Sequence, residues 1–137
     1  AVVATQPVDS DRAAAGWIRQ NHLEDKLWTG YPSWRAQTVF MMLDRPSYVM
    51  ETESFERFNR WSEMTDFSPH ALPGALSAAM KRLKVDTIYL VFYFSHGSEE
   101  PNFESLEGPL NFDRLTSVSD GEMDDFILYR VNSSPPP

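Results

Sequence analysis

An uninterrupted apolar run from Thr87 to Phe94, with the sequence TIYLVFYF, constrains the fold of this chain more than any other feature. It is rich in β-branched and aromatic residues, which favour a pleated, buried surface. Its apolar residues do not alternate with polar ones, as they would in a strand with one face in water. Such a run is typical of a strand covered on both faces, often at the centre of a parallel sheet. The sequence therefore predicts an α/β fold with 87–94 as an internal strand.

Helical periodicity precedes this run. Apolar residues spaced three and four apart predict helices over 10–21, from Ser33 to Leu43 with Ser33 as the cap, and over 72–83. A further helical stretch is expected from Ser54, with Phe55, Phe58 and Trp61 on one side. Short apolar runs predict strands at 26–29 and 48–51. Because helical segments separate these strands from each other and from 87–94, we expect all three to be parallel.

The pattern changes after the apolar run. Residues 95–109 are polar and acidic, which indicates a loop, and 112–118 and 126–131 predict two strands of an antiparallel hairpin. We predict one α/β domain over 10–131, with a lead-in segment at 1–9 and a disordered tail at 132–137. The expected architecture is a Rossmann-like three-layer core with a mostly parallel sheet and a C-terminal antiparallel hairpin.

Composition and missing motifs narrow the function classes. The formal net charge of −8 disfavours a nucleic-acid partner and, for the same reason, an anionic membrane surface. The absence of cysteine excludes disulfides, zinc–thiolate sites and thiol nucleophiles. The chain also lacks the GxGxxG, P-loop, GxSxG and HExxH motifs. The sequence therefore assigns no cofactor, no metal ligand and no catalytic residue.

An aromatic cluster with an arginine is the first candidate site. Trp28, Tyr31, Trp34 and Arg35 surround the turn after the first predicted strand, and ligands of open α/β sheets bind beyond the carboxyl ends of strands. These residues could stack a sugar or hold an anion. The favoured interpretation is that the two tryptophans are core residues where a helix meets the sheet, because buried aromatics are common and sites are few.

The second candidate is His96, which follows the central strand within Ser95-His96-Gly97 and precedes Glu99 and Glu100. It could act as a base oriented by a carboxylate. The favoured interpretation is an exposed loop histidine, because a serine beside a histidine in sequence does not make a triad. A third, acidic set suits a charged hairpin turn better than a calcium loop. Its members are Asp120, Glu122, Asp124 and Asp125.

Four stretches together resemble a known family. They are AAAGWIRQNH with the following KLWTG, then MLDRPSYV, LKVDTIYLV and DDFILYRV. Their order resembles the soluble C-terminal domain of bacterial polytopic glycosyltransferases of the dolichyl-phosphate-mannose-protein mannosyltransferase type. The resemblance covers most of residues 10–131 and is a pattern of elements and hydrophobicity.

The resemblance implies a non-catalytic accessory domain on the extracytoplasmic face of a bacterial membrane. Its partners would be the membrane domain of the same polypeptide and a glycan or lipid-linked sugar. The family's catalytic acids lie in loops of the membrane part, so none is carried over to this chain. We expect the gene to encode several apolar stretches of roughly 20 residues before Ala1.

Two other functions stay open, a small free-standing α/β enzyme using His96 and a carboxylate, and a protein-interaction module. Turnover abolished by His96→Ala would favour the enzyme.

Overall fold

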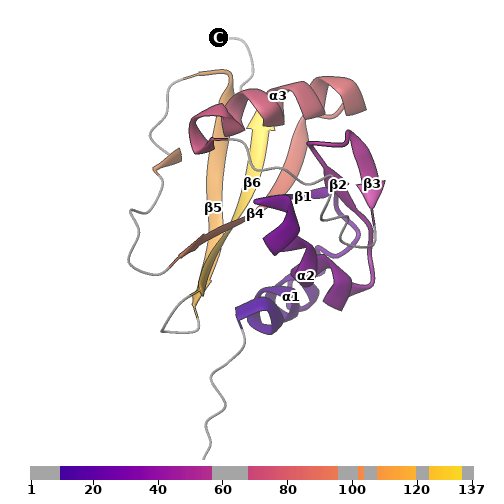
Figure 1. The fold of residues 1–137 in the computed structure, drawn as a ribbon, viewed down its shortest axis with the longest axis vertical. Helices are drawn as coiled ribbons and strands as arrows, with labels where there is room; N and C mark the ends of the chain where they lie inside the picture. The colour runs from indigo at the N-terminus through magenta and orange to yellow at the C-terminus, as the bar shows by residue number, and fades with distance from the viewer. Residues whose placement is uncertain (1–9, 57–67, 96–101, 104–107, 120–123, 134–137) are drawn as a thin grey trace, which may run out of the picture.

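The computed structural model describes residues 10–56, 68–95, 102–103, 108–119 and 124–133 (Figure 1). These ranges form a mixed α/β structure with one six-stranded sheet and three α-helices. The elements in chain order are α1 (Ser10–Gln20), β1 (Trp28–Tyr31), α2 (Ser33–Leu43), β2 (Ser47–Val49), β3 (Ser54–Glu56), the 3-10 helix η1 (Pro69–Ala71), α3 (Leu72–Leu83), β4 (Thr87–Ser95), β5 (Leu110–Ser119) and β6 (Asp124–Ser133). Within the described ranges, no helix has the length and apolar character needed to cross a membrane.

The sheet has the strand order β3-β2-β1-β4-β6-β5. β1 pairs in parallel with both β2 and β4, which confirms the predicted direction of these three strands. β4 lies between β1 and β6, so the apolar run is internal, as expected. The hairpin of β5 and β6 is antiparallel and also confirms the prediction.

The expectation of a mostly parallel sheet is wrong. β2–β3, β4–β6 and β5–β6 pair antiparallel, whereas only β1–β2 and β1–β4 are parallel. The reason is that the C-terminal hairpin joins the sheet through β6, beside the central strand. β6 also continues to Ser133, beyond the expected boundary at Val131. The lead-in 1–9 and residues 134–137 lie outside the described residues.

The helix expected from Ser54 is a second correction. Ser54–Glu56 instead forms β3, which pairs with β2 through Tyr48 and Phe55, and these two rings meet edge to face at 5.4 Å. Cross-strand aromatic pairing of this kind stabilises a sheet more than local helical spacing stabilises a short helix. The rest of that stretch, including Phe58 and Trp61, lies outside the described residues.

Helix ends follow simple backbone chemistry. Asp44 after α2 and Lys84 after α3 both adopt the left-handed conformation, and each donates its backbone N–H to carbonyls of the preceding turn. This arrangement satisfies carbonyl groups that a helix end leaves open. Pro46 then prevents α2 from continuing, while Lys81 and Arg82 place positive charge in the last turn of α3, where it favours the helix dipole.

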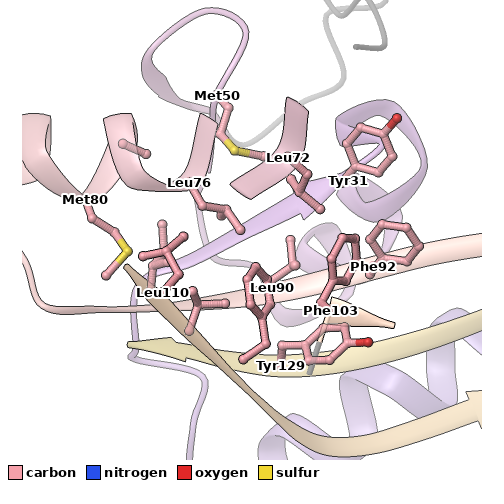
Figure 2. Packing of buried hydrophobic residues seen from close by; sticks show 14 of the residues in the cluster. Tyr31, Met50, Leu72, Leu76, Met80, Leu90, Phe92, Phe103, Leu110 and Tyr129 are labelled. Atoms are coloured by element: carbon pink, nitrogen blue, oxygen red, sulfur yellow. The ribbon is translucent and has the colours of Figure 1, made fainter. Parts of the chain in front are cut away.

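Alternating side chains of β4 point to opposite faces of the sheet and divide the core into two clusters. On one face, Leu90 and Phe92 pack beneath Leu72 and Leu76 of α3, with Tyr129 of β6 beside them (Figure 2). On the other face, Val91 packs with residues of α1 and α2. That second cluster also contains Ala14, Ala15, Ile18, Trp28, Ala36, Val39, Phe40, Leu43, Phe126 and Leu128. Helices therefore bury apolar surface against both faces of the sheet.

β1 and α2 approach each other closely at Gly30 and Ala36. A Cβ added at Gly30 would lie 2.2 Å from the Cβ of Ala36. We expect Gly30→Ala to destabilise the domain by about 1–3 kcal/mol, or somewhat more, because the rigid Ala36 methyl group cannot rotate away. Urea unfolding measures the loss.

Two variants test the cause of this effect. Ala36→Gly in the Gly30→Ala background should recover part of the stability, despite costing about 1 kcal/mol in helix propensity. Gly16→Ala in α1 is the matched control, because nothing lies within 4 Å of its added Cβ. It should be neutral or slightly stabilising. Equal losses for the two glycine variants would contradict the steric explanation.

Candidate functional site

A groove lies where β2 ends and the chain turns into β3, facing α3. Its volume is about 460 Å³, within the range of small-ligand sites. Parallel strands end at this edge of the sheet, which is where open α/β sheets bind ligands. The groove is lined by Tyr48, Met50, Glu51 and Glu53 from the strand and turn, and by Ala75, Ala78, Ala79 and Arg82 from α3.

The spacing of small residues in α3 leaves room for the groove. Ala75, Ala79 and Arg82 are four and three residues apart, so they lie along one side of the helix. The two alanines have no side chain beyond Cβ, and they form an apolar floor with the buried Tyr48 and Met50. The long side chain of Arg82 extends from the next turn to the rim. The groove therefore combines an apolar floor with a charged rim.

The rim carries opposite charges. The Arg82 Nη1 lies 3.3 Å from the Glu53 Oε2, and both side chains are more than half exposed. Such an exposed pair contributes little to stability, so both groups can exchange their partner for a ligand at low cost. Glu53 adopts a left-handed backbone conformation with a φ of 53°. This conformation is uncommon for a residue other than glycine and marks the tight turn between the strands.

A phenol lies within the same groove. Burial raises the pKa of Tyr48, an effect that the Arg82 guanidinium opposes and the Glu53 carboxylate reinforces. The hydroxyl is thus protonated at neutral pH and can donate a hydrogen bond. The groove offers a neutral donor, a guanidinium and carboxylates to one ligand.

Glu51 is held in place by the start of α2. The Ser33 Oγ donates a hydrogen bond of 2.7 Å to the Glu51 Oε1. A carboxylate near a helix N-terminus is also stabilised by the helix dipole. Ser33 was expected to cap α2, but the cap position is Pro32, which follows a cis peptide bond, and the hydroxyl of Ser33 instead bonds Glu51 and the Gly30 carbonyl. This contact fixes one wall of the groove.

The predicted aromatic site is not assembled on one surface. Trp28 and Tyr31 are three residues apart in β1, so their side chains point to opposite faces of the sheet. Trp28 is 3% exposed and donates its indole N–H to the Leu23 carbonyl at 2.8 Å. Tyr31 is buried in the other cluster and stacks on Phe92 with centroids 5.4 Å apart. The side chain of Trp34 is not among the parts of the chain that the structure describes.

Arg35, the cationic candidate, is occupied by an internal partner. Its Nη1 lies 2.6 Å from the Asp11 Oδ1 of α1, and both side chains are about one-seventh exposed. The guanidinium also lies over the rings of Tyr93 and Phe126, at 4.9 and 5.0 Å from their centroids. Arg35 therefore joins α1 and α2 to the sheet.

His96, Glu99 and Glu100 lie outside the described residues, as do Asp120, Glu122 and the side chains of Asp124 and Asp125. Among the residues that the structure describes, no three His, Asp or Glu side chains are grouped closely enough to hold a metal ion.

Sequence reasoning assigned Tyr48 and Glu51 to a strand and Arg82 to a helix end, and did not combine them into a site. The signal that could have drawn attention to α3 is its row of small residues leading to an arginine.

Comparison with known proteins assigns neither a family nor a function to the chain, since no family model, curated protein or solved structure matches it.

Proposed function

We propose that this chain is a non-catalytic, extracytoplasmic accessory domain of a membrane glycosyltransferase-like protein, and that the groove between α3 and the β2–β3 turn binds a glycan. The parent protein and the location are supported by the resemblance of the four sequence stretches. The choice of a glycan as the ligand is supported by the residues that line the groove. We also infer a Rossmann-like, three-layer plan, supported by parallel β2, β1 and β4 and by apolar helix faces against both sides of the sheet.

The observation that carries the proposal is the combination of groups in the groove. A sugar presents vicinal hydroxyls at its edges and apolar C–H groups on its faces. The Glu53 carboxylate and the Arg82 guanidinium can each form paired hydrogen bonds with neighbouring hydroxyls, and the Tyr48 hydroxyl can donate a further one. Met50, Ala75 and Ala79 supply an apolar surface for the sugar face. Ligand sites commonly combine an apolar lining with a few polar groups in this way.

Saccharide titration of Arg82→Ala tests the proposal. In a panel of mono- and oligosaccharides followed by NMR, we expect resonances of Tyr48, Glu53 and Ala79 to shift in the wild-type chain. Arg82→Ala should weaken binding roughly tenfold or more, because a hydrogen bond to a charged group contributes about 1.5–3 kcal/mol. The free energy of unfolding should fall by no more than about 1 kcal/mol, because the Arg82–Glu53 pair is exposed.

Lys81→Ala is the matched control. Lys81 is the preceding residue of α3 and is also exposed, but it lines a different cavity. This variant should bind saccharide like the wild-type chain. Equal weakening by both variants, or saccharide shifts confined to other parts of the chain, would overturn the assignment of the groove.

A further inference from the structure

The charges of this acidic chain are distributed unevenly. Residues 10–45 contain five cationic and four anionic side chains, which leaves seven cationic and sixteen anionic side chains for the rest of the 12 and 20 in the sequence. The segment that holds α1 and α2 is therefore net +1, whereas the remainder is net −9. Charges more than about 8 Å apart are largely screened at physiological salt, so a partner near α1 and α2 responds mainly to local charge.

α1 and α2 form one continuous layer. Asp11 near the start of α1 binds Arg35 near the start of α2, and the Arg19 guanidinium near the end of α1 donates to the Met42 carbonyl near the end of α2. The two helices thus lie side by side and run in the same direction. Figure 1 shows them together, away from α3.

Five exposed residues of α1, of α2 and of the turn after α2 combine positive charge with apolar surface, and we name them the Met–Arg patch. It consists of Arg12, Arg19, Met41, Met42 and Arg45, all of which are exposed. Met41 is 48% exposed and Met42 is 36% exposed, and with Phe55 of β3 they are the large hydrophobic residues most exposed in the described chain. The layer also contains acidic residues. The charge of Asp11 is neutralised by Arg35, and Asp44 is the acidic residue that lies beside the two methionines in sequence.

We propose that the Met–Arg patch docks on a membrane surface containing anionic lipid headgroups. The arginines fit the phosphate groups, because guanidinium binds phosphate in a bidentate manner. Met41 and Met42 are flexible and apolar, and they can enter the boundary between headgroups and acyl chains. The net charge of −8 disfavours such a surface for the chain as a whole. However, the excess negative charge lies outside the α1–α2 segment. Its repulsion from the lipid therefore orients the domain with α1 and α2 toward the membrane. The docking does not depend on the glycan groove, so either proposal can fail without the other.

Co-sedimentation with vesicles tests the charge requirement. The wild-type chain should bind vesicles of phosphatidylcholine containing one-third phosphatidylglycerol, and should bind pure phosphatidylcholine vesicles less well. Arg12→Gln/Arg45→Gln should weaken binding to the anionic vesicles about tenfold or more, because each cationic side chain near such a surface contributes substantially. Lys81→Gln/Lys84→Gln makes the same change in net charge on α3 and should weaken binding less than twofold. Added salt should release the wild-type chain.

A probe at a single site tests the orientation. Because the chain has no cysteine, Met42→Cys and Ala78→Cys can each be labelled uniquely with an environment-sensitive fluorophore. Anionic vesicles should shift the emission of the label at Met42→Cys to shorter wavelength and leave that at Ala78→Cys, an exposed position on α3, unchanged. No preference for anionic vesicles, equal losses in the two charge variants, or equal emission shifts at the two positions would overturn the proposal.

Discussion

Replacing Arg35 with alanine should destabilise the domain by about 3–5 kcal/mol, the usual cost of removing one partner of a buried ion pair. Arg35 binds Asp11 at 2.6 Å, and both side chains are largely buried. The substitution would also remove the guanidinium from the space over Tyr93 and Phe126, where it contributes packing and cation–π attraction. Urea unfolding followed by circular dichroism measures the change.

Two comparisons separate the ion pair from a general loss of positive charge. Arg45→Ala removes the same side chain at an exposed position and should change stability by no more than about 0.5 kcal/mol. Asp11→Ala should cost less in the Arg35→Ala background than in the wild-type chain, with a coupling of about 0.5–3 kcal/mol. Additive effects of the two substitutions would show that the pair does not join α1 to α2 energetically.

The helices were predictable because each one buries an apolar stripe against the sheet. Ala14 and Ile18, and likewise Leu72 and Leu76, are buried at helical spacing, and this periodicity is visible without any tertiary information. The left-handed Asp44 and the following Pro46 end α2 where the sequence indicates. Local signals of this kind do not depend on what the chain does elsewhere.

Strand direction was less predictable, because a continuous apolar run reports burial on both faces and contains no information about neighbours. β4 is covered by helices on both faces, as its sequence indicates, yet one neighbour is the parallel β1 and the other is the antiparallel β6. β3 was missed because Phe55 stands three residues before Phe58, which is helical spacing. Its strand conformation depends on pairing with Tyr48, a contact that the sequence alone does not show.

The groove was missed because its members are distant in sequence and each has an ordinary local role. Tyr48 belongs to a strand, Glu53 to a turn and Arg82 to a helix end that favours cations. Only the packing of α3 over this face of the sheet brings them together. By contrast, Trp28 and Tyr31 are close in sequence but lie in different core clusters, on opposite faces of the sheet. The predicted strand 26–29 ended before Tyr31, which placed that residue in a turn, whereas the observed β1 includes it and directs it away from Trp28.

Trp28→Ala distinguishes a core role from a sugar-binding role for the aromatic residues. Trp28 is almost fully buried and lies against Tyr89 and Phe40, with ring centroids 5.1 and 6.2 Å away. Its replacement should therefore cost about 3–5 kcal/mol, as expected for deleting a large aromatic side chain from a core. Saccharide binding, measured under conditions where the variant is still folded, should be unchanged.

Trp28→Phe refines this test because it retains an aromatic ring but removes the indole N–H that binds the Leu23 carbonyl. The loss should be smaller than for alanine, since phenylalanine leaves a smaller cavity. It should stay measurable because a cavity remains and one hydrogen bond to the Leu23 carbonyl is lost, although this carbonyl keeps the Lys26 N–H as a donor at 3.1 Å. Trp17→Ala, at a partly buried position of α1, should also cost less than Trp28→Ala because less apolar surface is removed from contact. If Trp28→Ala instead left the urea midpoint in place and abolished saccharide binding, Trp28 would belong to a binding surface. The glycan site would then have to be moved from the α3 groove to the surroundings of Trp28 at the start of β1.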